Sequence, residues 1–417
     1  MRTILLLLVS GAAALASQQE ASRDFEKRLP LAAGQRLTVE HSFGEVTVRG
    51  AAQKEVVIKA SLRAAGSSRE DAEKIVNAIE ITVDQSGGGV NVRTKYPDRS
   101  FSRRNMSFSV SYDITMPDYG QLDVRNSFGG VTVSDIKNSV TVKNGHGSLR
   151  VQNCKGTERL ENNFGTIDVQ GVSGDVTANN NNGAIKASDV TGSVEARSSF
   201  GSVTIERTGQ NVAVINSNGS IAVTEAGGEA RLTSSFGTIT ASGIAKGLTV
   251  TGTNGSVKVA RSGGPANVRT NFGSIELNDI NGGVEANNSN GSIRIAGVKG
   301  PARLTTTFGS LIVNDLGGSL DATNSNGSVQ ASLGATPGCQ PVTIRTNFGP
   351  VKLWLPDPAN YDISASTSFG KVSSEFPLTI SGQIASESVR GKIGNGGCEL
   401  RVSNSNGNVE ILKGPRK

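Results

Sequence analysis

The stretch GSVTIERTGQNVAVINSNG, residues 201–219, contains one complete structural unit of this chain. Val203 and Ile205 are separated by a single residue, and so are Val212 and Val214 after a short polar segment. Apolar residues at every second position are typical of a strand with one buried face, and β-branched residues favour strands. Residues that favour turns lie between the two pairs. The unit is therefore predicted to fold as strand, turn, strand, turn.

The same unit recurs along the chain, because successive units such as those beginning at Gly201 and Gly219 are 18 residues apart. Each unit is marked by a glycine that follows Phe and Asn in alternation, with His146 in one Asn place. These glycines are Gly129, Gly147, Gly165, Gly183, Gly201, Gly219, Gly237, Gly255, Gly273, Gly291, Gly309 and Gly327. A repeat of this length, without slips, indicates a solenoid or a similar array.

Two all-β architectures fit the repeat. Asn-Gly between alternating strands is a strong hairpin signal, which favours an antiparallel meander. A long meander would leave one wide apolar face uncovered, because the repeat contains no helical segment. A parallel β-helix, with one unit per coil, buries the Val and Ile residues between two facing sheets. We therefore predict a parallel β-helix (β-solenoid) with coils of about 18 residues; a coil of 36 residues is the less favoured variant.

In each strand every second side chain is expected to point inward. Counting on in steps of two, the residue before each marker glycine is also expected to point inward. In one unit these positions run through Asn216 to Asn218, and in the next they run through Ser234 to Phe236. We therefore expect the alternating Phe and Asn to be internal corner residues. Asparagines such as Asn254 are then expected to hydrogen-bond between coils.

The segments outside the regular repeat differ in character. Residues 1–16 combine a basic start, a short apolar run and an Ala-x-Ala site, which predicts a secretory signal peptide. Residues 17–121 are expected to form a strand-rich cap with one helix at about 68–78, because a solenoid needs its open strand edges covered. Residues 122–335 are the regular solenoid. Residues 336–417 contain proline-rich loops and are expected to form irregular coils and a second cap.

The distribution of basic residues along the chain bears on which class of molecule it can bind. The formal net charge is +6 with a pI near 9.2, but the basic residues are scattered singly. Nucleic acid is excluded as a partner, because the chain is expected to be exported and few aromatic residues occupy outward positions. No segment of the mature chain is apolar enough to cross a membrane. We expect a periplasmic, cell-surface or secreted protein whose partner is an envelope or extracellular polysaccharide or protein.

The chain has three cysteines, Cys154, Cys339 and Cys398. Cys339 and Cys398 both lie in the irregular C-terminal part. A disulfide between them and three free thiols are both compatible with the sequence.

Several motifs carry a family resemblance. They are FGEVTV at residues 43–48, YDITMP at 112–117, the Gly-x-Val/Ile-x-Val/Ile repeats, KIG at 392–394 and SNGNVEI at 405–411. With these motifs the chain resembles the putative adhesin family of exported bacterial proteins, also called domain of unknown function 4097, over nearly the whole mature part. The resemblance implies a β-helix-like repeat domain in a bacterial cell envelope. It implies no reaction, because no catalytic motif of the family can be transferred.

No catalytic, cofactor-binding or metal-binding residue is predicted. Aspartates recur six residues after the marker glycine, at Asp135, Asp189, Asp279 and Asp315. Turn formation is favoured there, because calcium needs six to eight oxygen ligands and these residues are isolated. His41 precedes the first Phe-Gly pair and His146 replaces an Asn, so neither has the spacing of a metal site.

The favoured functional hypothesis is an exported, non-enzymatic β-solenoid with an adhesin-like or scaffolding role in the bacterial cell envelope. A β-helix carbohydrate-active enzyme, a polysaccharide lyase or hydrolase, is the alternative from another class. It would require an acidic cluster in a groove, which the sequence does not show. An envelope-stress sensing module is a third hypothesis.

Overall fold

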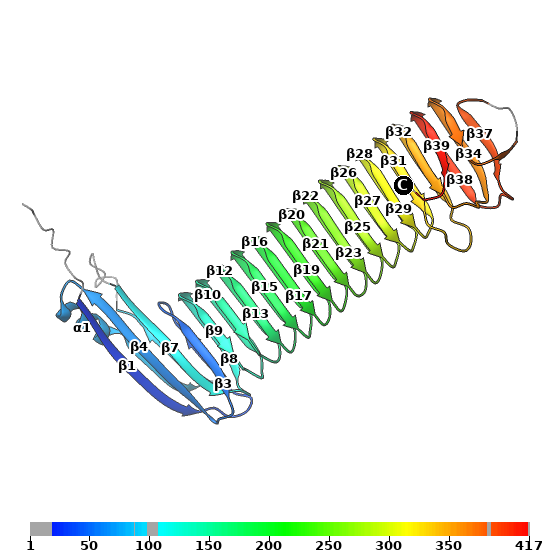
Figure 1. The fold of residues 1–417 in the computed structure, drawn as a ribbon. Helices are drawn as coiled ribbons and strands as arrows, with labels where there is room; N and C mark the ends of the chain where they lie inside the picture. The colour runs from blue at the N-terminus through cyan, green and yellow to red at the C-terminus, as the bar shows by residue number, and fades with distance from the viewer. Residues whose placement is uncertain (1–18, 87, 98–106, 382–384, 416–417) are drawn as a thin grey trace, which may run out of the picture.

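The computed structural model describes residues 19–86, 88–97, 107–381 and 385–415, and Figure 1 shows them as an elongated rod of stacked strands. Val194 in β16 (Val194–Phe200) pairs in parallel with Val212 in β18 (Val212–Asn218). The register therefore advances by one unit per coil, which confirms the parallel β-solenoid and the 18-residue coil. The predicted signal peptide at residues 1–16 lies outside the described residues.

Each coil gives one strand to each of two parallel sheets. The regular strands of sheet A are β9 (Val131–Ser134), β11 (Leu149–Gln152), β13 (Ile167–Val172), β15 (Ile185–Val190), β17 (Val203–Thr208), β19 (Ile221–Ala226), β21 (Ile239–Ile244), β23 (Val257–Ser262), β25 (Ile275–Ile280), β27 (Ile293–Val298), β29 (Leu311–Leu316), β31 (Val329–Leu333) and β33 (Val351–Leu355). Sheet B contains β16 and β18 together with β8 (Gln121–Phe128), β10 (Val140–His146), β12 (Glu158–Phe164), β14 (Val176–Asn182), β20 (Ala230–Phe236), β22 (Leu248–Asn254), β24 (Ala266–Phe272), β26 (Val284–Asn290), β28 (Ala302–Phe308), β30 (Leu320–Asn326) and β32 (Val342–Phe348).

The period-2 residues of each unit form the core. Val203 and Ile205 of sheet A and Val212 and Val214 of sheet B are all buried. The same holds for the equivalent positions of nearly every coil, so the two sheets share one continuous apolar layer along the rod. Burial of this apolar surface, at roughly 25 cal/mol per Å², is the main stabilising contribution to the stack.

The marker glycines allow the coils to stack closely at one corner. Gly201 has a φ of +129°, and a Cβ added to it would lie 2.3 Å from the carbonyl oxygen of Gly183 in the preceding coil. Neither the backbone conformation nor the contact tolerates a side chain. This requirement explains why the glycine recurs without a slip.

The expectation that Phe and Asn before the glycine face inward is wrong. Phe236 is 54% exposed, whereas Asn216 is only 1% exposed. The parallel ladder pairs Asn216 with Ser234 and Asn218 with Phe236 but skips Ser217. The alternation of the strand is interrupted there, so the buried corner residue lies two positions earlier than expected. Asn254, which the sequence predicts to face inward and hydrogen-bond between coils, is half-buried at an outward position.

The N-terminal region extends both sheets. Sheet A continues from β9 through β3 (Val46–Ala51) to three long antiparallel-paired strands, β7 (Ser107–Pro117), β4 (Glu55–Gly66) and β1 (Gln19–Pro30). Sheet B continues from β8 through β2 (Arg36–Glu40) to β6 (Gly89–Lys95) and β5 (Glu80–Ser86). The predicted helix is confirmed as α1 (Arg69–Ala78), which contacts β1 and β4 and is capped by Ser68.

The C-terminal strands do not stack in chain order. After β32 and β33 the chain forms β34 (Tyr361–Phe369), β35 (Val372–Ser374), β36 (Leu378–Ile380) and β37 (Ser388–Ile393), and then β38 (Glu399–Asn406) and β39 (Val409–Lys413). The last two strands insert between the coil of β32 and β33 and the coil of β34 and β35 (Figure 1). Cys339 and Cys398 form a disulfide that ties the β31–β32 loop to the start of this inserted coil. Cys154 is free and buried.

Candidate binding groove

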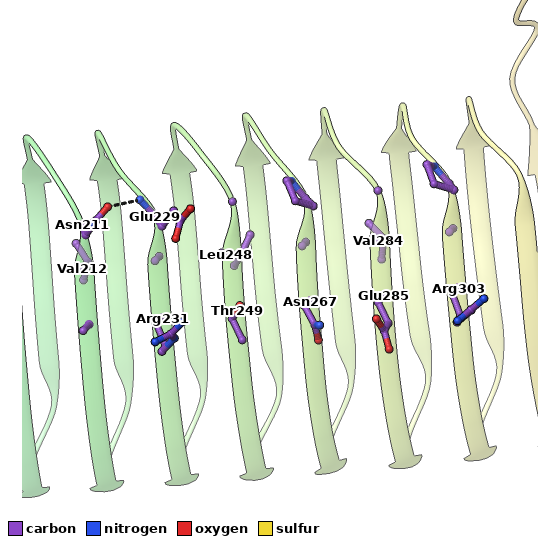
Figure 2. Close-up of a pocket in the computed structure, with 18 of the residues that line it drawn as sticks. Asn211, Val212, Glu229, Arg231, Leu248, Thr249, Asn267, Val284, Glu285 and Arg303 are labelled. Carbon is purple, nitrogen blue, oxygen red and sulfur yellow. Dashed lines mark hydrogen bonds between the residues drawn. The ribbon is translucent and has the colours of Figure 1, made fainter.

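A groove runs across the strands at the edge where the chain passes from sheet A to sheet B. We call it the edge groove; it encloses about 770 Å³ and crosses the strands from β18 to β30. At the strand spacing of about 4.8 Å its length is roughly 30 Å. Figure 2 shows its lining residues on successive strands. An extended molecule would therefore lie along the rod axis, perpendicular to the strands.

One side of the edge groove has no long side chains, because glycine or proline precedes each of four successive strands. These residues are Gly247, Pro265, Gly283 and Pro301. A Cβ on Gly247 would lie 3.3 Å from Cδ of Pro265, and a Cβ on Gly283 would lie 3.4 Å from Cδ of Pro301. Each proline therefore packs on a glycine of the preceding coil, and no long side chain covers this part of the groove.

The other side presents polar side chains from the outward face of sheet B. Five exposed residues lie on successive strands in Figure 2: Arg231, Thr249, Asn267, Glu285 and Arg303. They supply hydroxyl, amide, guanidinium and carboxylate groups, so the row offers both hydrogen-bond donors and acceptors. This chemistry suits a hydrated, extended polar ligand.

The acidic residues of the groove are dispersed. Asp321 forms ion pairs with Arg303 at 3.6 Å and with Arg345 at 3.1 Å. At the other end, the side-chain oxygen of Asn211 accepts a 2.9 Å hydrogen bond from the backbone N–H of Glu229 (Figure 2). Among the described residues, no group of three or more His, Cys, Asp or Glu is placed to hold a metal ion.

The recurring aspartates of the sequence lie in tight turns. Asp135, Asp189, Asp279 and Asp315 have φ values between 52° and 61°, a left-handed conformation that Asp adopts more readily than most residues. The carboxylate of Asp189 accepts hydrogen bonds from the Arg207 side chain, one coil further along, at 2.7 and 3.1 Å. These bonds hold the pKa of Asp189 below its usual value. The arrangement supports the turn interpretation.

The two histidines lie apart from the edge groove. His146 is stacked between Phe128 and Phe164, with ring-centroid distances of 4.6 and 4.7 Å. The buried His41 has Nδ1 3.0 Å from the hydroxyl oxygen of Tyr96 and 3.2 Å from that of Thr94. Burial lowers the pKa of His41 to about 4, so the ring is neutral at physiological pH. These side-chain contacts of His41 lie within the N-terminal region, to which Thr94 and Tyr96 belong.

Glu158 is a chemically unusual residue that the sequence interpretation overlooked. It is fully buried, and neither carboxylate oxygen has a hydrogen-bond partner among the described residues. It pairs in register with Val140 on one side and Val176 on the other, so a carboxyl group occupies an apolar core position. Burial raises its pKa to about 8. The signal was present in the sequence, because Glu158 is one unit away from each of these valines.

One comparison with known proteins found a family match for part of the chain. Residues 245–412 match the family model described as Toastrack DUF4097, which confirms the predicted resemblance for that part of the chain. A comparison with curated proteins found no match. No helix among the described residues is long and apolar enough to span a membrane.

Three solved structures are similar to this chain at low identity. A putative cell adhesion protein from Clostridium sporogenes is 9% identical, with a TM-score of 0.20, over 94% of this chain and 100% of its own. A putative adhesin from Bacteroides fragilis is 12% identical, with a TM-score of 0.16, over 81% and 98%. A putative lipid binding protein from Parabacteroides distasonis is 11% identical, with a TM-score of 0.21, over 72% and 96%.

Proposed function

We propose that this chain, whose residues 245–412 carry a Toastrack DUF4097 domain, is an exported, non-enzymatic rod that binds an extended polymer in the bacterial cell envelope. Its role is then adhesin-like or scaffolding. The observation that supports the proposal is the edge groove, which crosses several coils in one direction and carries a row of polar side chains along one side. A long ligand gains contacts in proportion to the number of coils it crosses.

The orientation of the edge groove favours a polysaccharide over an extended peptide. A peptide gains affinity on a sheet mainly by adding a strand, which requires free backbone groups parallel to it. The edge groove runs across strands whose backbone groups are paired with the neighbouring coils, as Arg231 is with Ala213 and Thr249. Recognition must therefore come from side chains, and the amides, hydroxyls and charges of this row can hydrogen-bond sugar hydroxyls.

A binding assay tests the proposal. Purified protein is titrated with a panel of soluble bacterial polysaccharides, and the double variant Arg231→Ala/Asn267→Ala is compared with Arg294→Ala. Arg294 is an exposed arginine on β27 of sheet A and therefore serves as the matched control. We expect the groove variant to weaken binding about tenfold or more and the control to leave it unchanged. Equal effects of both variants would contradict binding in the groove.

The same assay separates binding from catalysis. Reducing ends and unsaturated ends are measured after prolonged incubation with each polysaccharide that binds. A non-enzymatic rod releases no product. New ends that depend on Glu285 or Asp321 would replace the proposal by the alternative of a carbohydrate-active enzyme.

Cell fractionation tests the proposed location. The protein is expected in the periplasmic, surface or culture fraction of the bacterium that produces it. Recovery of the full-length chain, with residues 1–16 attached, in the cytoplasm would contradict export.

A further inference from the structure

The edge of the rod opposite the edge groove carries a row of exposed side chains in which Phe alternates with a smaller or flatter residue. We call it the Phe/Asn ladder; in spatial order it consists of Phe128, His146, Phe164, Asn182, Phe200, Asn218, Phe236, Asn254, Phe272, Asn290, Phe308, Asn326, Phe348 and Asn406. Two further phenylalanines flank the ladder, Phe43 beside Phe128 and Phe369 beside Asn406. The seven phenylalanines of the ladder are between 45% and 55% exposed. Apolar side chains exposed in a continuous row of this length indicate an interaction surface.

The short segments that carry the ladder are free of charge, and charged residues such as Lys143 and Glu161 lie just outside them. Each coil contributes a four-residue segment to this edge, such as SFGS at 199–202 and SNGS at 217–220. The fourteen segments from 127–130 to 405–408 contain no Asp, Glu, Lys or Arg. The neighbouring residues are mostly Ser, Thr, Asn and Gly, which are small and leave the edge flat. Depletion of charge around aromatic residues is the compositional signature of the centre of a protein–protein interface.

The ring faces of the ladder are not available to a flat ligand. Phe128, His146 and Phe164 stack face to face with interplanar angles of 13° and 9°. Further along, each Phe has an in-register Asn on both sides, as Phe236 has Asn218 and Asn254, at the strand spacing of about 4.8 Å. The stacked rings of Phe128, His146 and Phe164 therefore cover one another's faces, whereas a sugar would stack on an open ring face. The ladder is better suited to another row of side chains than to a polysaccharide.

The alternation of large and small residues makes the ladder complementary to itself. Phenylalanines recur roughly every 10 Å along the rod. In the gap between two of them lies a smaller Asn or, in one case, His146. A second identical row fits when its phenylalanines enter these gaps. We propose that the Phe/Asn ladder is the interface of an antiparallel homodimer in which two rods interlock along this edge.

The symmetry of the pairing follows from the sequence of the ladder. A two-fold axis perpendicular to the rod, between the coils of Phe236 and Asn254, places Phe236 of each copy opposite Asn254 of the other. The remaining positions of the ladder then match in the same way, with Phe128 opposite Asn406 and Phe348 opposite His146. Only the flanking Phe43 and Phe369 face each other as two phenylalanines, at the ends of the interface. This arrangement is isologous and closed, so it gives a dimer rather than an open filament.

The exposed phenylalanine rings supply most of the area that a stable dimer needs. A buried Phe contributes about 200 Å², so a half-exposed one offers about 100 Å². Seven such residues give roughly 700 Å² per copy before the Asn and Ser rows are added, and a stable interface needs about 800 Å² per partner. The edge groove lies on the opposite edge and remains open in the dimer.

Sedimentation equilibrium of the purified full chain tests the proposal. We expect twice the chain mass, and a monomer for the variant Phe200→Ser/Phe236→Ser/Phe272→Ser. Ile215→Ser is the matched control, because Ile215 is 49% exposed on β18 but lies outside the ladder. Circular dichroism shows that each variant retains its strands. A wild-type monomer at all concentrations, or an equal effect of the control, would overturn the proposal.

A second variant distinguishes interlocking from general stickiness. Asn254→Phe increases the apolar area of the edge but fills the gap that Phe236 of the other copy enters. Interlocking predicts at least tenfold weaker dimerisation for this variant, whereas a merely sticky surface predicts tighter association. Tighter dimerisation of Asn254→Phe than of the wild type would contradict the interlocked arrangement.

Cross-linking tests the direction of the two rods. Asn254→Cys places two thiols about one strand spacing apart along the axis, whereas Asn326→Cys places them roughly 40 Å apart. A short bismaleimide is expected to link the first variant and not the second. Cys154 is buried and the other two cysteines are paired, so they do not compete. Equal cross-linking of both variants would contradict the antiparallel arrangement. Polysaccharide binding by the ladder variants is measured in parallel, because it should survive whether or not the dimer forms.

Discussion

The side-chain amide of Asn216 donates a 2.9 Å hydrogen bond to the carbonyl oxygen of Gly201 in the preceding coil. The same contact recurs at Asn180 with Gly165, Asn288 with Gly273 and Asn324 with Gly309. Ser, Thr or Gly takes this place in several other coils. At this interior corner the asparagine amides bond buried carbonyl groups of the preceding coil, whereas the hydroxyls of Ser198 and Thr346 have no partner among the described residues.

Replacement of Asn216 by Leu should destabilise the protein, because it leaves the carbonyl oxygen of Gly201 without its side-chain donor. The expected cost is about 1–3 kcal/mol, the usual penalty for a buried polar group that loses its partner. Urea denaturation followed by circular dichroism measures it. Ser217→Leu is the matched control, because Ser217 is the exposed neighbour of Asn216 on the same strand. Equal losses in the two variants would show that the buried corner has been assigned to the wrong residue.

Replacement of Gly219 by Ala should be more damaging. The added Cβ would lie 2.2 Å from the carbonyl oxygen of Gly201, at a φ of +141° that disfavours side chains. We expect a loss of about 3 kcal/mol or more, or a failure to fold. Ser220→Ala, at the exposed next position, should change stability little. A Gly219→Ala variant with the unfolding midpoint of the wild type would contradict the close stacking at this corner.

Glu158 should make stability depend on pH. Its pKa in the folded protein is about 8, above the value of 4.5 for an exposed glutamate. The folded state therefore holds the proton more tightly, and the stability present below pH 4.5 is lost as pH rises toward 8.

The difference in melting temperature between Glu158→Val and the wild type reports this effect. Valine matches the in-register Val140 and Val176. The variant should be the more stable protein, by a margin that grows from pH 5 to pH 8.5. Glu158→Gln, which removes the ionisation but keeps a polar side chain, should share the pH dependence of the valine variant. A constant margin over this range would rule out a titrating buried carboxyl group.

The disulfide should hold the inserted C-terminal coil in place. Cys339 and Cys398 are 59 residues apart in sequence, and closing a loop of this length stabilises a folded state by about 4 kcal/mol in the chain-entropy model. The Cys339→Ser/Cys398→Ser variant should therefore expose β38 and β39 to hydrogen exchange while the regular coils stay protected. Cys154→Ser provides the comparison, because Cys154 is not cross-linked. Uniform loss of protection along the rod would contradict a local role.

The regular coils were predictable because local pattern and tertiary structure coincide in them. Val203, Ile205, Val212 and Val214 follow the strand period, and their burial requires only that the two strands of a coil face each other. The marker glycines fix the coil length independently of any partner.

The outward direction of Phe236 was not predictable from that period. It depends on a break in the pairing at Ser217, which is set by the geometry of the stacked corner and not by residue type. Phenylalanine is also usually buried, so its hydrophobicity favoured the wrong side. The insertion of β38 and β39 was likewise hidden, because the sequence shows the order of segments and not which gap a returning segment fills.

The edge groove could not be located from the sequence either. It depends on which outward residues of different coils come into register, as Arg231, Thr249 and Asn267 do. The groove also depends on glycines and prolines at one turn position of each coil. In the sequence these residues look like ordinary turn residues.

The stacked glycine corner repeats with every coil, whereas the Phe/Asn ladder repeats only with every second one. A tandem duplication of the gene segment for one coil would preserve the backbone stacking but place two phenylalanines side by side. Duplication of a two-coil segment preserves both. The backbone stack therefore repeats every coil, but the ladder repeats every two coils. The rod can be lengthened by duplication without disturbing the ladder only in steps of two coils.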